Sequence, residues 1–93
     1  MKSNITIQQI EKSKIHSVDF NNLPFGSVYS DHMLECDFIN GEWQTPVIKP
    51  YSPITLDPAA KIFHYGQSIF EGMKAYKDSQ GNTMLFRPLE NCK

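Results

Sequence analysis

The pair Asn40-Gly41 constrains the fold more than any other feature of the sequence, because it lies between two stretches that can form strands. Asn-Gly is the strongest short signal for a type I′ turn, whose twist matches that of paired antiparallel strands. The stretch from His32 to Ile39 alternates apolar and polar residues, and Trp43 to Ile48 can return as the second strand. The sequence therefore predicts a β-hairpin. Its expected inner face carries Leu34, Cys36 and Phe38, and its expected solvent face carries Glu35, Asp37 and Gln44.

Four prolines follow the hairpin at short intervals: Pro46, Pro50, Pro53 and Pro58. Each proline restricts the residue before it to extended or turn conformations. The stretch from Ile54 to Leu56 is predicted to be a short strand between two such breaks. Asp57 is expected to cap a helical turn that Pro58 opens. A second short helix is predicted over residues 64–70, where Tyr65 and Ile69 fall near one face.

A second hairpin is predicted toward the C-terminus. Residues 71–77 form the first expected strand, residues 78–82 supply turn chemistry, and residues 83–86 are β-prone again. A strand or arm is expected near Ile5 to Ile10, and a helix is expected to begin at Pro88. Because no crossover segment separates the strands, the expected fold class is α+β, with antiparallel hairpins and short helices rather than a parallel sheet.

The composition excludes several classes of partner. With 93 residues, 40 % of them hydrophobic, the chain is expected to form one globular unit. Nine basic and ten acidic residues give a formal net charge of −1, so no nucleic-acid partner is expected. The chain has neither a long apolar run nor an apolar leader, so we expect no membrane association and a cytoplasmic location.

Neither the cysteines nor the histidines indicate a metal site or a disulfide scaffold. Cys36 and Cys92 match no metal or redox spacing and are expected to be reduced thiols. The histidines at positions 16, 32 and 64 have no paired ligand spacing. A domain of this size buries only about 60 % of the surface that its unfolded chain exposes, so its stability is expected to be marginal. The helix that begins at Pro88 also has little room before Lys93, and we expect the chain to be part of a longer protein.

The segment from His64 to Tyr76, HYGQSIFEGMKAY, is similar to the signature segment of branched-chain amino acid aminotransferases. The stretch from Leu85 to Leu89 resembles the one that follows it in that family. Phe25-Gly26, with Ser30 to Met33 after it, also fits at the right distance. The resemblance thus covers roughly residues 25 to 93.

The resemblance implies that residues 1–93 are the N-terminal part of the small domain of a fold type IV enzyme, the class typified by D-amino acid aminotransferase. Such enzymes use pyridoxal 5′-phosphate, and the expected substrates are Leu, Ile or Val with 2-oxoglutarate. The large domain with the catalytic lysine would be absent, so the fragment is expected to be inactive. Neither Lys74 nor Lys93 is that lysine, and the family's phosphate-binding arginine would come just after Lys93. No catalytic, cofactor-binding or metal-binding residue is therefore expected here.

The resemblance also implies a set of substrate-binding residues. Phe25 and Phe70 would line the side-chain pocket of their own subunit, and Tyr65 would reach into the neighbouring subunit of a homodimer. Gly72 would let the backbone approach the substrate closely, because it has no Cβ. Lys74 would steer a carboxylate near the entrance. Discrimination among aliphatic side chains requires such a close-fitting apolar wall.

Each residue also has a simpler interpretation. Taken alone, Phe25 and Phe70 are ordinary core residues, Tyr65 is a half-buried aromatic with a satisfied hydroxyl, and Gly72 marks a bulge. His64, Glu71 and Arg87 have structural roles by the same reasoning. Two alternatives for the whole chain stay open. One is another enzyme of the same fold type, a D-amino acid aminotransferase or an aminodeoxychorismate lyase, and the other is a non-catalytic binding domain.

Overall fold

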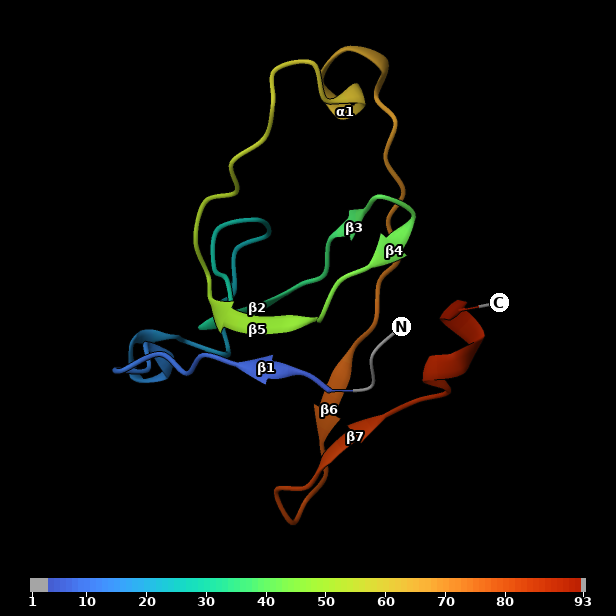
Figure 1. Cartoon of the computed structure of the whole chain (residues 1–93). Helices are drawn as coiled ribbons and strands as arrows, with labels where there is room; N and C mark the ends of the chain where they lie inside the picture. The colour runs from blue at the N-terminus through green and yellow to red at the C-terminus, as the bar shows by residue number, and fades with distance from the viewer. Residues whose placement is uncertain (1–3, 93) are drawn as a thin grey trace. The chain divides into compact units, whose positions relative to one another are not determined.

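The computed structural model describes residues 4–92. The chain divides into two compact units, an N-terminal unit that runs through Thr55 and a C-terminal unit that begins at Leu56. The elements of the N-terminal unit are β1 (Thr6–Ile7), η1 (Ile15–Ser17), β2 (His32–Glu35), β3 (Phe38–Ile39), β4 (Glu42–Trp43) and β5 (Val47–Pro50). Those of the C-terminal unit are α1 (Lys61–Tyr65), β6 (Ala75–Lys77), β7 (Thr83–Leu85) and η2 (Pro88–Cys92), as labelled in Figure 1.

The hairpin predicted around Asn40-Gly41 is confirmed. Strands β3 and β4 pair antiparallel with Phe38 opposite Trp43, and their rings contact at 5.0 Å between centroids. Asn40 and Gly41 have φ values of 53° and 79°, both positive as a type I′ turn requires. The same two chain segments pair again further from the turn, where β2 and β5 run antiparallel.

An irregular stretch separates the two parts of this hairpin. Pro46 lies just before β5 and has no N–H to donate, so it interrupts the ladder at that point. The N–H of Gln44 still donates to the carbonyl of Asp37 at 2.7 Å, which keeps the two segments together. Pro46 is also the one residue of the described chain that is buried.

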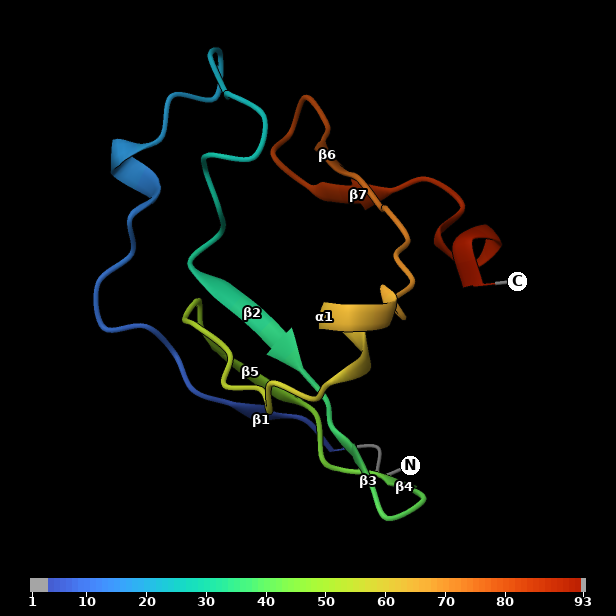
Figure 2. The same ribbon diagram turned by 90° about the horizontal axis from the view of Figure 1, so that it is seen from above.

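Strand β5 is the centre of a three-stranded sheet with β1 and β2 as its edges, which Figure 2 shows from above. β1 runs parallel to β5, with Thr6 opposite Val47. The sequence predicts antiparallel strand pairs only, and this prediction is wrong for the pair β1 and β5. A parallel pair needs a long connection between its strands, and the long stretch of chain between β1 and β5 provides it.

The expected faces of the first hairpin are correct for Asp37 and Gln44, which are exposed, but wrong for Leu34, Phe38 and Glu35. Leu34 was assigned to the inner face but is 62 % exposed, whereas Glu35 is half-buried. The carboxylate of Glu35 lies 3.6 Å from Nζ of Lys49 on the neighbouring strand. Among the described residues no large apolar side chain is buried, so neither unit contains a hydrophobic core.

Helix α1 begins and ends earlier than the helix predicted over residues 64–70, and it begins later than the helical turn predicted after Asp57. The carboxylate of Asp57 accepts the N–H of Ala59 at 2.7 Å, as expected for a capping residue, but α1 starts only at Lys61. The helix ends at Tyr65 because Gly66 adopts the left-handed conformation that terminates helices, with φ of 60°. The predicted helix over residues 64–70 is therefore wrong beyond Tyr65. The predicted strand from Ile54 to Leu56 is wrong as well, because that segment pairs with no strand.

The second hairpin is confirmed with a shorter first strand. β6 pairs antiparallel with β7, Tyr76 opposite Met84, and the ladder begins at Ala75 rather than at residue 71. The expected helix at the C-terminus is the 3-10 helix η2, which begins at Pro88 as predicted. Arg87 precedes it and pairs with Glu90 at 3.3 Å.

The described structure thus consists mostly of antiparallel strands with few short helices, in agreement with the α+β class. None of the helices in residues 4–92 is long and apolar enough to cross a membrane.

Candidate functional site

The predicted substrate-binding residues lie in both units. Phe25 belongs to a turn in the N-terminal unit, and its side chain is fully exposed. Tyr65 is the last residue of α1 and is 81 % exposed. Phe70, which is 98 % exposed, lies with Gly72 and Lys74 on the irregular segment between α1 and β6. Within residues 4–92, the simpler interpretations of Phe25 and Phe70 as core residues and of Tyr65 as a half-buried ring therefore do not hold.

Local contacts position Gly72 and Lys74 within the segment between α1 and β6. The N–H of Gly72 donates to the carboxylate of Glu71 at 2.8 Å, so Glu71 has the structural role of a backbone-capping group. A Cβ added at Gly72 would meet no atom within 4 Å. Nζ of Lys74 lies 5.0 Å from the centroid of the Tyr76 ring, a distance typical of a cation–π contact. This contact holds the Lys74 ammonium beside the start of β6.

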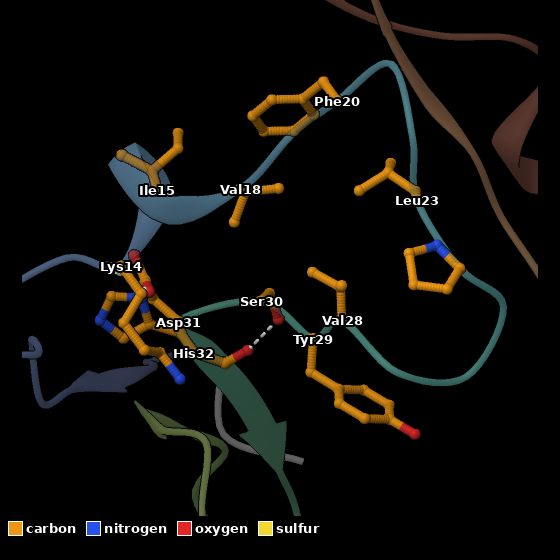
Figure 3. Close-up of a pocket in the computed structure, with 11 residues that line it drawn as sticks. Lys14, Ile15, Val18, Phe20, Leu23, Val28, Tyr29, Ser30, Asp31 and His32 are labelled. Atoms are coloured by element: carbon orange, nitrogen blue, oxygen red, sulfur yellow. Dashed lines mark hydrogen bonds between the residues drawn. The ribbon is translucent and has the colours of Figure 1, made fainter.

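The N-terminal unit contains a hollow of about 500 Å³ that the sequence did not predict. Figure 3 shows Val18, Leu23 and Val28 directed into the same space, with Phe20 above them. These apolar residues follow no helical or strand period, because the segment that carries them is irregular. Periodicity analysis therefore could not find the hollow.

The polar end of the hollow is formed by Lys14, Asp31 and His32. The carboxylate of Asp31 accepts the hydroxyl of Ser13 and the N–H of Lys14, and these two hydrogen bonds lower the pKa of Asp31. Nε2 of His32 accepts the N–H of Ile10 at 3.0 Å. The Asp31 and His32 side chains thus bind the N-terminal segment to the start of β2.

Within residues 4–92, no group of three or more His, Cys, Asp or Glu side chains is placed to hold a metal ion. Cys36 is a free thiol whose Sγ donates to the carbonyl of Gln44 at 3.3 Å. The side chain of Cys92 and all of Lys93 lie outside the described residues.

No protein-family model matches the chain. Individual proteins of known name do match it. Over 76 residues the chain is 47 % identical to branched-chain-amino-acid transaminase 1 of Bacillus subtilis (strain 168). Over 76 residues it is 49 % identical to the probable branched-chain-amino-acid aminotransferase of Staphylococcus aureus (strain MRSA252). Over 89 residues it is 43 % identical to the cytosolic branched-chain-amino-acid aminotransferase of Saccharomyces cerevisiae (strain ATCC 204508 / S288c).

These matches cover 81 %, 81 % and 95 % of this chain but only 21 %, 21 % and 23 % of the relatives. All three relatives are named as enzymes that transfer amino groups. The chain belongs to the branched-chain aminotransferase family, and it spans about a fifth of the length of the curated relatives it matches.

Proposed function

We propose that the whole protein is a pyridoxal-phosphate-dependent aminotransferase that moves the amino group of Leu, Ile or Val to 2-oxoglutarate. The observation that carries this proposal is the identity of 43 % to 49 % with relatives named as branched-chain aminotransferases, over most of this chain. We further propose that the chain is the N-terminal segment of the small domain of a fold type IV enzyme, and that the enzyme is a cytoplasmic homodimer.

The role we propose for this segment is to build the wall that selects aliphatic side chains. Leu, Ile and Val offer no polar handle, so an enzyme must recognise them by shape in an apolar pocket. Aromatic rings supply large, rigid contact area for this purpose. Phe25 and Phe70 have rings that the described residues leave exposed, which supports their assignment to such a wall. Tyr65, exposed at the end of α1, would extend the wall of the partner's site.

The remaining two residues of the proposed site have smaller roles. Gly72 offers a side-chain-free stretch of backbone with open space beside it, which supports close approach to a substrate. The ammonium of Lys74, held beside the Tyr76 ring, would attract the substrate carboxylate.

The described residues do not fit pyridoxal phosphate. At the polar end of the hollow in the N-terminal unit, the Asp31 carboxylate lies with Lys14, and its negative charge would offset the attraction of Lys14 for a phosphate group. In the C-terminal unit, Arg87 is paired with Glu90. We therefore propose that the cofactor, which acts as an electron sink when bound, is held by the part of the protein that this chain does not cover.

Alanine substitutions at Tyr65 and Phe70 test the proposed wall. In a protein of the relatives' full length, each change is expected to lower kcat/KM for leucine about 10- to 200-fold, because losing the contact of one methylene in an apolar pocket costs about 1–3 kcal/mol. We expect kcat/KM for glutamate to fall less than kcat/KM for leucine. The measurement is steady-state transamination with each amino donor. Phe63→Ala is the matched control, since Phe63 is a 58 % exposed ring on α1 outside the proposed site.

Equal losses with leucine and glutamate would contradict the assignment of these rings to the pocket. A wild-type protein that used D-amino acids, or that released pyruvate from aminodeoxychorismate, would instead place it among the other enzymes of this fold type.

A further inference from the structure

We propose that Tyr29 is a positioning residue for Phe25: its hydroxyl, and the stacking of its ring on Tyr51, hold the turn that presents Phe25 to the substrate. This inference rests on the proposed function, in which Phe25 belongs to the side-chain pocket. Tyr29 itself touches neither substrate nor cofactor in this account. All of the contacts that carry the inference lie within the N-terminal unit.

The hydroxyl of Tyr29 closes the turn that follows Phe25. It donates a hydrogen bond of 2.7 Å to the carbonyl of Gly26, three residues earlier in the chain. Gly26 has φ of +75°, a conformation that glycine adopts without the strain that a Cβ would cause. The turn therefore depends on two features, a glycine that permits it and a hydroxyl that holds the glycine's carbonyl.

The ring of Tyr29 is itself held against the end of the central sheet. It stacks on the ring of Tyr51 with 5.0 Å between centroids and 9° between planes. Tyr51 directly follows β5, and its N–H donates to the carbonyl of Asp31 at 2.9 Å, one position beyond the β2–β5 pair His32 and Pro50. This hydrogen bond extends the β2–β5 ladder by one position and fixes the backbone of Tyr51, on whose ring Tyr29 stacks. A continuous series of contacts runs from β5 through Tyr51 and Tyr29 to Gly26, next to Phe25.

Phe25 needs such support because the other described residues leave its side chain uncovered. Within residues 4–92 the ring is fully exposed, so the backbone of the turn is what this part of the chain contributes to its position. A pocket wall that is held in place before the substrate arrives binds more tightly, because less conformational entropy is lost on binding. Loosening the turn should therefore weaken the binding of aliphatic substrates more than it slows the chemistry.

The test compares Tyr29→Phe with the wild type in the holoenzyme of full length. This change removes the hydroxyl and keeps the ring stack. We expect KM for leucine to rise about fivefold, because a hydrogen bond between neutral groups is worth a factor of about 2–12. The value of kcat should stay within about twofold, and KM for glutamate should change less than KM for leucine.

Ser17→Ala is the matched control. The hydroxyl of Ser17 also donates to a carbonyl three residues earlier, that of Lys14 at 2.8 Å, in the same unit but away from Phe25. KM for leucine should be unchanged in this variant. A second comparison tests whether Tyr29 acts through Phe25: Phe25→Ala combined with Tyr29→Phe should have the same KM for leucine as Phe25→Ala alone.

The inference is overturned if Tyr29→Phe matches the wild type, or if its effect adds fully to that of Phe25→Ala. If Tyr29→Phe fails to fold, Tyr51→Leu replaces it, because this change removes the stack and keeps the Tyr29 hydroxyl. A KM for leucine equal to that of the wild type in Tyr51→Leu then overturns the inference. A wild-type protein that does not transaminate leucine overturns the proposed function and this inference together, whereas an active wild type with unaffected variants overturns this inference alone.

Discussion

At the residue scale, Asp31 shows how a single half-buried residue organises an irregular segment. Its carboxylate accepts hydrogen bonds from Ser13 and from the backbone of Lys14, while its own carbonyl accepts the N–H of Tyr51. Residues far apart in the sequence therefore meet at one aspartate. Both hydrogen bonds to the carboxylate favour its charged form, and the pKa of Asp31 is lowered from its ordinary value.

The lowered pKa predicts that this contact is sensitive to acid. A carboxyl group with a depressed pKa in the folded state stabilises the fold fully above its ordinary value, about 3.9, and loses this contribution as the pH falls toward the folded value. In the full-length protein we expect the hydrogen-exchange protection of the Lys14 amide to be constant near neutral pH and to fall below about pH 4. Hydrogen exchange measured by NMR across this range checks it.

Asp31→Asn should remove the pH dependence of that protection. Asp37→Asn serves as the control, because Asp37 is an exposed carboxylate that contacts the chain through its backbone carbonyl. Protection of Lys14 that persists unchanged in the wild type at pH 3 would show that the carboxylate does not hold this segment.

At the scale of elements, the hairpin of β6 and β7 is stabilised mainly through its turn. The strands are three residues each and all of their residues are exposed, so packing contributes little. The carboxylate of Asp78 accepts the N–H groups of Gln80 and Asn82 and the side-chain amide of Asn82. The N–H of Asp78 donates to the carbonyl of Asn82 at 2.9 Å, which closes the turn.

Asp78→Ala is therefore expected to open this hairpin locally. The amides of Asn82 and Gln80 should lose their hydrogen-exchange protection, because aspartate side chains hold turns by bonding to backbone N–H groups two residues on. Gln80→Ala should leave the protection unchanged, since Gln80 takes part in the turn through its backbone N–H. Loss of protection across both units in Asp78→Ala would instead mean that the hairpin does not open independently.

At the scale of the whole molecule, the described residues lack a hydrophobic core. The exposed apolar residues include Trp43, Phe63, Phe70 and Phe86 among many others. Hydrophobic burial is the dominant favourable term in folding, and conformational entropy opposes it at every residue. A chain of this length that buries so little apolar surface has almost nothing to offset that entropy.

The 93 residues alone are therefore expected to lack a cooperative unfolding transition. The isolated chain should bind a hydrophobic dye, show no sharp calorimetric peak, and show neither cofactor absorbance nor transamination. The protein of the relatives' full length should unfold cooperatively, since it supplies further apolar surface to cover these residues. A sharp transition or enzymatic activity in the isolated chain would contradict this account.

The parts of the fold that the sequence predicted correctly are those that local chemistry decides. Asn40-Gly41 forms its turn because both residues tolerate positive φ, and residues 78–82 form theirs because Asp78 bonds to the backbone nearby. Pro88 opens a helical turn because its φ is already helical. The family resemblance could also be recognised from the sequence, since a motif is a local run of residues. This resemblance identified the candidate substrate-binding residues. Their roles stay predictions.

What only the tertiary structure decided depends on contacts between distant residues. The parallel pairing of β1 with β5 is set by where a long connection returns, and no local pattern encodes it. The reversal of Leu34 and Glu35 follows from the strand pairing that places Lys49 beside Glu35. The stack of Tyr29 on Tyr51 likewise exists because the β2–β5 register brings their backbones together. The sequence alone determined the turns and the family, because these depend on residues that are neighbours in the chain. The strand pairing, the exposed faces of the strands and the ring contacts depend on the free energy of contacts between segments that meet only in the folded chain.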